Sequence, residues 1–218
     1  MSNEKKYNTI IKHYEDCLDK HGDTHLGVDW PKAEDVNKRY RVMCDLFLHR
    51  EKNLKHAKLL DFGCGAAHLL EYIQREEISG IAYSGLDISE KFVALSKKKF
   101  PQQNFYCLDI LENSGSLPIY DYIVANGAFT EKRDLSYEEM FIYLCSALKI
   151  IFAKAEKGIA FNLMSKHVNW EREDLFHVPF DEIASFISKE LSRNFVFRSD
   201  YGLYEYTVYV YKQPELNG

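Results

Sequence analysis

Residues 58–70, with the sequence KLLDFGCGAAHLL, decide the fold that this chain is predicted to adopt. An apolar run ends in Asp61, and two glycines, Gly63 and Gly65, follow before His68 and further apolar residues. This pattern is typical of a strand that turns into a helix. The glycines either only let the backbone turn tightly, or they leave room for a ligand against bare main chain. The helix start offers free N–H groups to an anion.

Strands and helices alternate along the chain from about residue 53. Runs rich in β-branched and aromatic residues predict strands, and helix-period segments predict helices. Strands that are separated by helix-length segments are typical of crossover units in a parallel sheet. The predicted strands are 57–62, 81–86, 104–108, 120–125 and 157–163, and the predicted helices are 66–76, 89–99, 136–153 and 181–191.

The last part of the chain departs from this alternation. Residues 193–212 hold two β-rich runs, 194–199 and 203–211, on either side of a short turn at Asp200-Tyr201-Gly202. Two consecutive strands that are joined by a short turn pair antiparallel. The sequence therefore predicts a mostly parallel sheet with an antiparallel finish.

The first part of the chain reads as helical. Apolar residues from Tyr7 to Leu18 fall on one helical face, and a second amphipathic segment carries Val36 to Phe47. A polar loop with two glycines, GDTHLGVDWP, joins the two segments. We therefore predict a helical cap or lid over residues 1–52 and a main α/β domain over residues 53–218.

Composition limits the class of protein. The chain has 218 residues, which is enough for one domain of good size. Its net charge of −5 argues against a nucleic-acid partner. The five cysteines are scattered and form no C-x-x-C pair, which fits a reducing compartment. The polar start and the lack of a long apolar run predict a cytoplasmic protein without a membrane partner.

Two further acids favour a ligand at the glycine turn. Asp87 follows the second predicted strand, about twenty residues past the glycines, where an acid can accept hydrogen bonds from ribose hydroxyls. Asp109 follows the third predicted strand. Either acid alone reads equally well as a helix cap or a turn residue. Acids at three successive strand ends, with glycines after the first, predict an adenosine site.

These motifs resemble those of class I S-adenosylmethionine-dependent methyltransferases, in particular small bacterial ones that act on small molecules. LLDFGCGAAH is similar to the first motif of that family, GLDIS to its ribose-binding acid, and CLDI to its adenine-binding turn. YDYIVANGAF resembles the strand and loop beside the reacting methyl group. The resemblance covers residues 53–211 and departs at Ala67, where the family often has a third glycine.

The resemblance implies a fold, a cofactor and a set of binding residues. The fold is a Rossmann-like, mostly parallel seven-stranded sheet with helices on both faces and an antiparallel C-terminal strand. The cofactor is S-adenosylmethionine, which is released as S-adenosylhomocysteine. Gly63 and Gly65 would contact its aminoacyl end, Asp61 would hold the loop or the ammonium group, and Asp87 the ribose. The remaining predicted cofactor-binding residues are Asp109 and Ile110 at the adenine, Asn126 below the methyl group, and Trp30 and Arg39 from the cap.

Two other classes stay open at this point. A nicotinamide-dependent oxidoreductase would want the fingerprint G-x-G-x-x-G, but His68 stands at the position of its third glycine. A binding protein that keeps the pocket without catalysis would show the same motifs. Comparing the binding of S-adenosylmethionine with that of NAD separates a methyltransferase from an oxidoreductase. Measuring turnover separates a methyltransferase from a binding protein.

The acceptor is less well marked in the sequence. A long irregular stretch at 162–180 holds several polar residues and one tryptophan, which is typical of a substrate loop. His177 and His167 in this stretch are the candidate catalytic bases, and their spacing matches no metal site. We predict O-methylation of a small polar metabolite, such as a sugar or a secondary metabolite, by a monomer or homodimer. N-methylation, which needs no base, is the nearest alternative.

Overall fold

The computed structural model describes residues 5–51 and 54–214. Residues 1–4 and 52 of the predicted cap, and the boundary at 52/53, lie outside the described residues. The strands are β1 (Ala57–Phe62), β2 (Ile81–Asp87), β3 (Asn104–Cys107), β4 (Tyr120–Ala125), β5 (Ala155–Ser165), β6 (His177–Val178), β7 (Asn194–Arg198) and β8 (Glu205–Tyr211). The α-helices are α1 (Asn8–His21), α2 (Ala33–Leu48), α3 (His68–Arg75), α4 (Glu90–Lys99), α5 (Ile110–Asn113), α6 (Tyr137–Lys154) and α7 (Phe180–Glu190), and the 3-10 helices are η1 (Leu26–Val28) and η2 (Ser114–Ser116).

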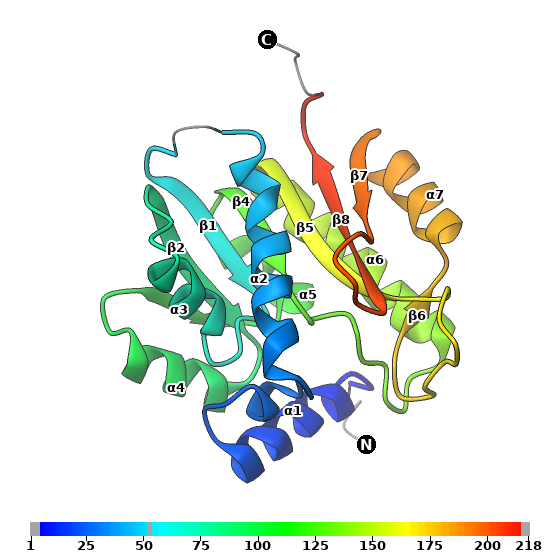
Figure 1. Ribbon diagram of the computed structural model, residues 1–218, viewed down its shortest axis with the longest axis horizontal. Coiled ribbons are helices and arrows are strands. Elements are labelled where there is room, and N and C mark those ends of the chain that lie inside the picture. The colour runs from blue at the N-terminus through cyan, green and yellow to red at the C-terminus, as the bar shows by residue number, and fades with distance from the viewer. Residues whose placement is uncertain (1–4, 52–53, 215–218) are drawn as a thin grey trace.

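The strands form one sheet in the order β3-β2-β1-β4-β5-β8-β7, with β6 beside β5 (Figure 1). The first five strands pair parallel, and β8 runs antiparallel between β5 and β7. The predicted mostly parallel sheet with an antiparallel finish is therefore confirmed. The additional strand β6 has two residues, which is too short to give a periodic signal in the sequence.

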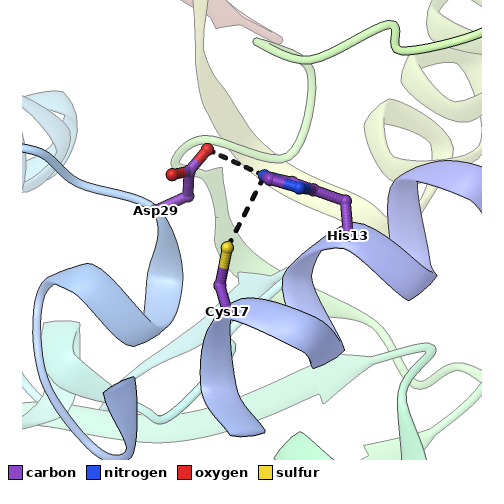
Figure 2. Close-up of side chains that lie close together, drawn as sticks. All are labelled: His13, Cys17 and Asp29. Carbon is purple, nitrogen blue, oxygen red and sulfur yellow. Dashed lines mark hydrogen bonds and ion pairs between the residues drawn. The ribbon is translucent and has the colours of Figure 1, made fainter. Parts of the chain in front are cut away.

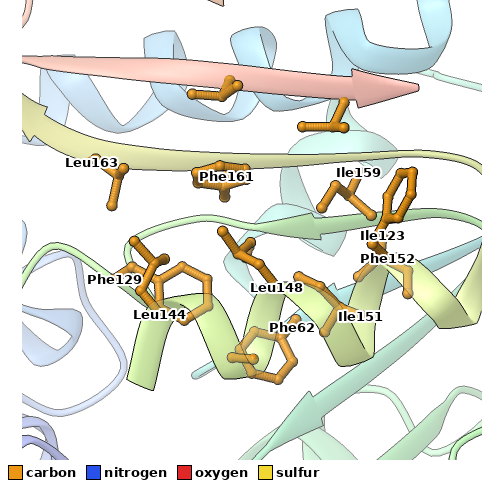
Figure 3. Close-up of a cluster of buried hydrophobic side chains, with 14 of the residues drawn as sticks. Phe62, Ile123, Phe129, Leu144, Leu148, Ile151, Phe152, Ile159, Phe161 and Leu163 are labelled. Carbon is orange, nitrogen blue, oxygen red and sulfur yellow. The ribbon is translucent and has the colours of Figure 1, made fainter. Parts of the chain in front are cut away.

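Helices cover both faces of the sheet. α2, α3 and α4 pack on one face, and α6 and α7 on the other. The core under α6 is built from its apolar stripe and the inward residues of β4 and β5, among them Leu148, Ile151, Ile123 and Phe161 (Figure 3). Residues 122–125 of β4 and 158–161 of β5 are buried on both faces, so these segments read as continuous apolar runs rather than as alternating ones.

The two helices of the predicted cap have different positions. α2 is part of the sheet-covering layer, because six of its residues, including Leu46 and Phe47, are buried against the sheet and α3. α1 has a single buried residue, Ile10, and crosses the carboxyl ends of the strands (Figure 1). Only α1 and the following loop therefore have the position of a lid.

No helix in residues 5–51 or 54–214 has the length and apolar character that a membrane span requires.

Candidate active site

A pocket lies beyond the carboxyl ends of β1, β2 and β4, where the strand order reverses. Its cavity volume is about 140 Å³. In open α/β sheets this is the usual place for a ligand. Eight of the nine predicted cofactor-binding residues line it: Trp30, Asp61, Gly63, Gly65, Asp87, Asp109, Ile110 and Asn126. The ninth, Arg39, lies behind Trp30.

The loop between β1 and α3 uses three left-handed residues. Gly63 has a φ of +72°, Gly65 of +51° and Ala67 of +58°. The Gly63 amide donates a 2.8 Å hydrogen bond to the Leu86 carbonyl, which ties the loop to β2. At Gly63 and Gly65 the backbone conformation favours glycine, because other residues seldom adopt these angles. The departure at Ala67 places a non-glycine residue in a strained conformation.

Asp87 ends β2 and is held by the main chain on two sides. Its Oδ2 accepts from the Gly65 amide and its Oδ1 from the Ser89 amide, both at 2.9 Å. Burial raises the pKa of this carboxyl, and the amide donors oppose the rise. A carboxylate can accept about four hydrogen bonds. Asp87 therefore connects the glycine loop to β2 and keeps acceptor capacity for ligand hydroxyls.

Asp61 is buried at the end of β1, with 3% of its surface exposed. The Tyr83 hydroxyl donates a 2.8 Å hydrogen bond to its Oδ2. Burial raises the pKa of Asp61 to about 7; Tyr83 opposes this shift and the charge of Asp87 adds to it. A cationic group in the pocket would stabilise the ionised form of Asp61.

Asp109 contacts both the main chain and the N-terminal segment. Its Oδ1 accepts from the Leu111 amide at 3.0 Å, which makes it the cap of α5. Its Oδ2 accepts from Lys5 Nζ and from the Tyr7 hydroxyl, each at 2.6 Å. Burial favours a higher pKa for Asp109, but Lys5 and Tyr7 outweigh it and lower the pKa. The residue predicted to bind adenine thus also anchors the segment before α1.

α1 covers the pocket on the side away from the sheet, through apolar contacts, hydrogen bonds and an ion pair. Ile10, Ile11 and Tyr14 line the pocket, and the Tyr14 hydroxyl donates to the Gly127 carbonyl at 3.3 Å. Glu15 accepts from the Ser89 hydroxyl at 2.6 Å, and Asp19 pairs with Lys91 at 2.6 Å. Ser89 and Lys91 belong to the start of α4, so α1 is tied to the same edge of the sheet as Asp87, the acid predicted to bind ribose.

Trp30 forms the wall beside Gly127, and Arg39 lies behind it. The Arg39 guanidinium lies 4.0 Å from the centre of the Trp30 ring. A Cβ atom at Gly127, whose φ is +80°, would lie 2.7 Å from Trp30 Cζ2. Trp30 therefore packs directly on the main chain after β4. The Asn126 side-chain oxygen in the same wall is buried and has no hydrogen-bond partner, so it offers an acceptor to a ligand.

The structure does not bring the two predicted catalytic histidines to this pocket. His177 is buried, with Nδ1 2.6 Å from the Ser165 carbonyl and Nε2 accepting from the Arg172 amide at 3.3 Å. The His167 ring stacks on Phe180. Both histidines make their contacts within the segment that follows β5. The sequence could not predict this, because helix and strand periodicity says nothing about the direction of side chains in a long loop.

A polar cluster that the sequence did not predict lies next to Tyr14. His13 Nε2 is 2.9 Å from Asp29 Oδ2 and 3.7 Å from Cys17 Sγ (Figure 2). These three donors lie close enough together for a metal ion. However, Nη2 of Arg133 hydrogen-bonds to the same His13 nitrogen, so a guanidinium already occupies the cation position. Glu131, 2.9 Å from Arg133 Nε, completes the cluster, and burial raises its pKa to about 7.

The comparisons with known proteins agree with this geometry. Residues 60–137 match the family model for a methyltransferase domain. This segment is a methyltransferase domain. A protein of Mycobacterium tuberculosis that is named as a methyltransferase is 26% identical over 157 residues, which cover 70% of this chain and 91% of that protein.

Solved structures match the methyltransferase fold over nearly the whole chain. Magnesium protoporphyrin IX methyltransferase from Synechocystis, solved with bound S-adenosylmethionine, has a TM-score of 0.66 at 17% identity and covers 98% of this chain and 100% of its own. A [4+2]-cyclase has a TM-score of 0.60 at 15% identity and covers 86% of this chain and 72% of its own. These structures confirm the predicted Rossmann-like fold. The match at residues 60–137 and the Mycobacterium tuberculosis relative support the predicted S-adenosylmethionine-dependent methyltransferase.

Proposed function

We propose that this methyltransferase binds S-adenosylmethionine in the pocket under α1 and O-methylates a small polar metabolite. The observation that supports this most is that the three acids predicted to bind the cofactor, Asp61, Asp87 and Asp109, line one pocket. Gly65 lines the same pocket, and its amide donates a hydrogen bond to Asp87. The pocket is covered by α1, which suits an acceptor small enough to pass a lid. Transfer to a sulfonium-activated methyl group mainly requires that acceptor and methyl lie in line.

The choice of oxygen over nitrogen rests on the polar cluster. A hydroxyl must lose its proton during transfer, and a group with a pKa near the working pH is the best proton acceptor. Glu131 has such a pKa, and the His13–Asp29 pair lies beside Tyr14, which lines the pocket. His167 and His177 remain candidates, but they act on the pocket only if the loop after β5 rearranges.

The test is a screen of metabolite extracts with isotopically labelled S-adenosylmethionine, followed by mass spectrometry of the labelled product. A product labelled on oxygen supports the proposal, and one labelled on nitrogen, carbon or sulfur contradicts it. His13→Ala and His177→Ala are then compared on that acceptor. Loss of turnover by roughly 10²–10⁴-fold in one variant, with unchanged cofactor affinity, identifies the base.

The second candidate is a protein that binds the cofactor without transferring its methyl group. The structural match to a [4+2]-cyclase favours keeping it, because the same fold there carries a different reaction. Cofactor binding without any labelled product, across extracts, supports this candidate. The cytoplasm remains the predicted compartment. The predicted assembly is a monomer or homodimer, and sedimentation would distinguish the two.

A further inference from the structure

A buried carboxylate that the sequence did not mark lies at the start of β8. Glu205 has 2% of its surface exposed. Its Oε2 accepts from Arg39 Nε at 2.9 Å, and its Oε1 accepts from Asn162 Nδ2 at 3.0 Å. A buried carboxylate is costly unless donors satisfy it, and here two donors from different elements do so. Glu205 therefore joins α2 to the middle of β5.

The hydrogen bonds fix the orientation of Asn162. Its Oδ1 accepts from the Gly127 amide at 2.7 Å, so its Nδ2 must face Glu205 as a donor. Arg39 also presents only N–H groups. Both oxygens of Glu205 must therefore accept, which a carboxylate does and a glutamine amide does not. The Gly127 main chain, in the wall of the pocket, depends on this arrangement.

The contacts form a closed ring. From Glu205 it passes through Arg39 to Trp30, which packs on Gly127, and returns through Asn162. Nη1 of Arg39 is buried without a hydrogen-bond partner, so its two N–H groups have no acceptor. A buried donor without a partner costs about 1–3 kcal/mol. The anionic group of S-adenosylmethionine is the carboxylate at its aminoacyl end.

We propose that Glu205 is a positioning residue for the aminoacyl end of the cofactor, acting through Arg39, and for the Gly127 main chain, acting through Asn162. This inference rests on the proposed function. Arg39 would hold the cofactor carboxylate with Nη1. Glu205 accepts from Nε, which fixes the direction of the guanidinium and balances its buried charge. Arg39 alone, without Glu205, would carry an unpaired charge and turn away from this direction.

The experiment compares two ligands by isothermal titration. S-Adenosylhomocysteine carries the carboxylate, whereas 5′-methylthioadenosine has the same adenosine and thioether but lacks the aminoacyl end. Glu205→Gln should weaken binding of S-adenosylhomocysteine by roughly tenfold or more, the size expected for one charge-assisted hydrogen bond, and leave methylthioadenosine binding unchanged. Glu51→Gln, which removes a paired carboxylate bound to Tyr122 and Lys157, is the matched control and should change neither affinity.

The outcomes separate this inference from the proposed function. Equal weakening of both ligands in Glu205→Gln, or no weakening of either, overturns the positioning role alone. A wild-type chain that binds neither ligand overturns the proposed function and the positioning role together. If Glu205→Gln does not fold, Arg39→Lys answers the same question, because it keeps the charge for Glu205 and loses the second donor. It should lose the preference for S-adenosylhomocysteine over methylthioadenosine.

Discussion

A single backbone conformation at Ala67 has a measurable cost. Ala67 is buried with a φ of +58°, whereas its neighbour Ala66 is equally buried and does not have a positive φ. Ala66→Gly loses a buried methyl group and gains unfolded-state freedom, which should lower the free energy of unfolding by roughly 1–2 kcal/mol. Ala67→Gly has the same losses but also relieves roughly 1–2 kcal/mol of left-handed strain, so its net effect should be close to zero. Urea unfolding of the two variants gives the difference directly. Equal destabilisation would contradict a strained Ala67.

Asp61 makes the stability of the ligand-free protein depend on pH. Its pKa is raised from 3.8 to about 7, so between these values the folded state holds a proton that the unfolded state has lost. The stabilising contribution is complete below the unfolded pKa and is lost as pH rises toward 7. The free energy of unfolding should therefore fall by roughly 1.4 kcal/mol per pH unit for this group between about pH 5 and about pH 7.

Two variants test this dependence. Asp61→Asn should remove the contribution of Asp61 and flatten the pH profile of unfolding. Glu131→Gln removes the other acid whose pKa burial raises to about 7, and it should flatten the profile by a similar amount. If neither variant changes the slope between about pH 5 and about pH 7, both carboxyls are ionised in the folded state over this range.

At the scale of elements, α1 should behave as a lid. It buries one residue, and several of its contacts to the rest of the chain are polar tethers such as Glu15 to Ser89 and Asp19 to Lys91. Elements with few buried contacts open at low free energy. If the ligand leaves only when α1 opens, S-adenosylhomocysteine at about 100 times its Kd should slow amide exchange in α1 by roughly 100-fold.

Hydrogen exchange followed by mass spectrometry measures this protection over residues 8–31. α7 is the internal comparison, because it packs on the far part of the sheet and contributes nothing to the pocket lining. Protection of α1 and not of α7 supports the lid. Unchanged exchange in α1 at saturating ligand would mean that the pocket fills without this helix.

At the scale of the whole molecule, ligand binding should raise stability in a selective way. A ligand that binds only the folded state adds RT ln(1 + [L]/Kd), which is about 2.7 kcal/mol at 100 times Kd. S-Adenosylhomocysteine should stabilise the chain by this amount and NAD should not. Asp87→Ala should lose the effect, while Glu90→Ala, which removes an exposed acid three residues away, should keep it. Stabilisation by NAD alone would favour the oxidoreductase that the glycine pattern left open.

The sequence by itself determined the parts of this protein that depend on local pattern. Strand and helix periods placed β1 at residues 57–62 and β4 at 120–125 as the structure has them. Parallel strands end at one edge, so Asp61, Asp87 and Asp109 could be assigned to one pocket before any contact was known. Once the strands are known to be parallel, the residues that follow them must lie at the same edge of the sheet.

Only the tertiary structure decided what depends on contacts between distant segments. Asn162 and Glu205 are polar residues inside apolar strands, which is a visible signal, but their partners Gly127 and Arg39 lie 35 and 166 positions away along the chain. That α2 of the predicted cap covers the sheet while α1 lies over the pocket depends on which face α2 buries against the sheet. The histidines at 167 and 177 turned away from the pocket because loop side chains follow their hydrogen-bond partners, and no periodic pattern encodes those.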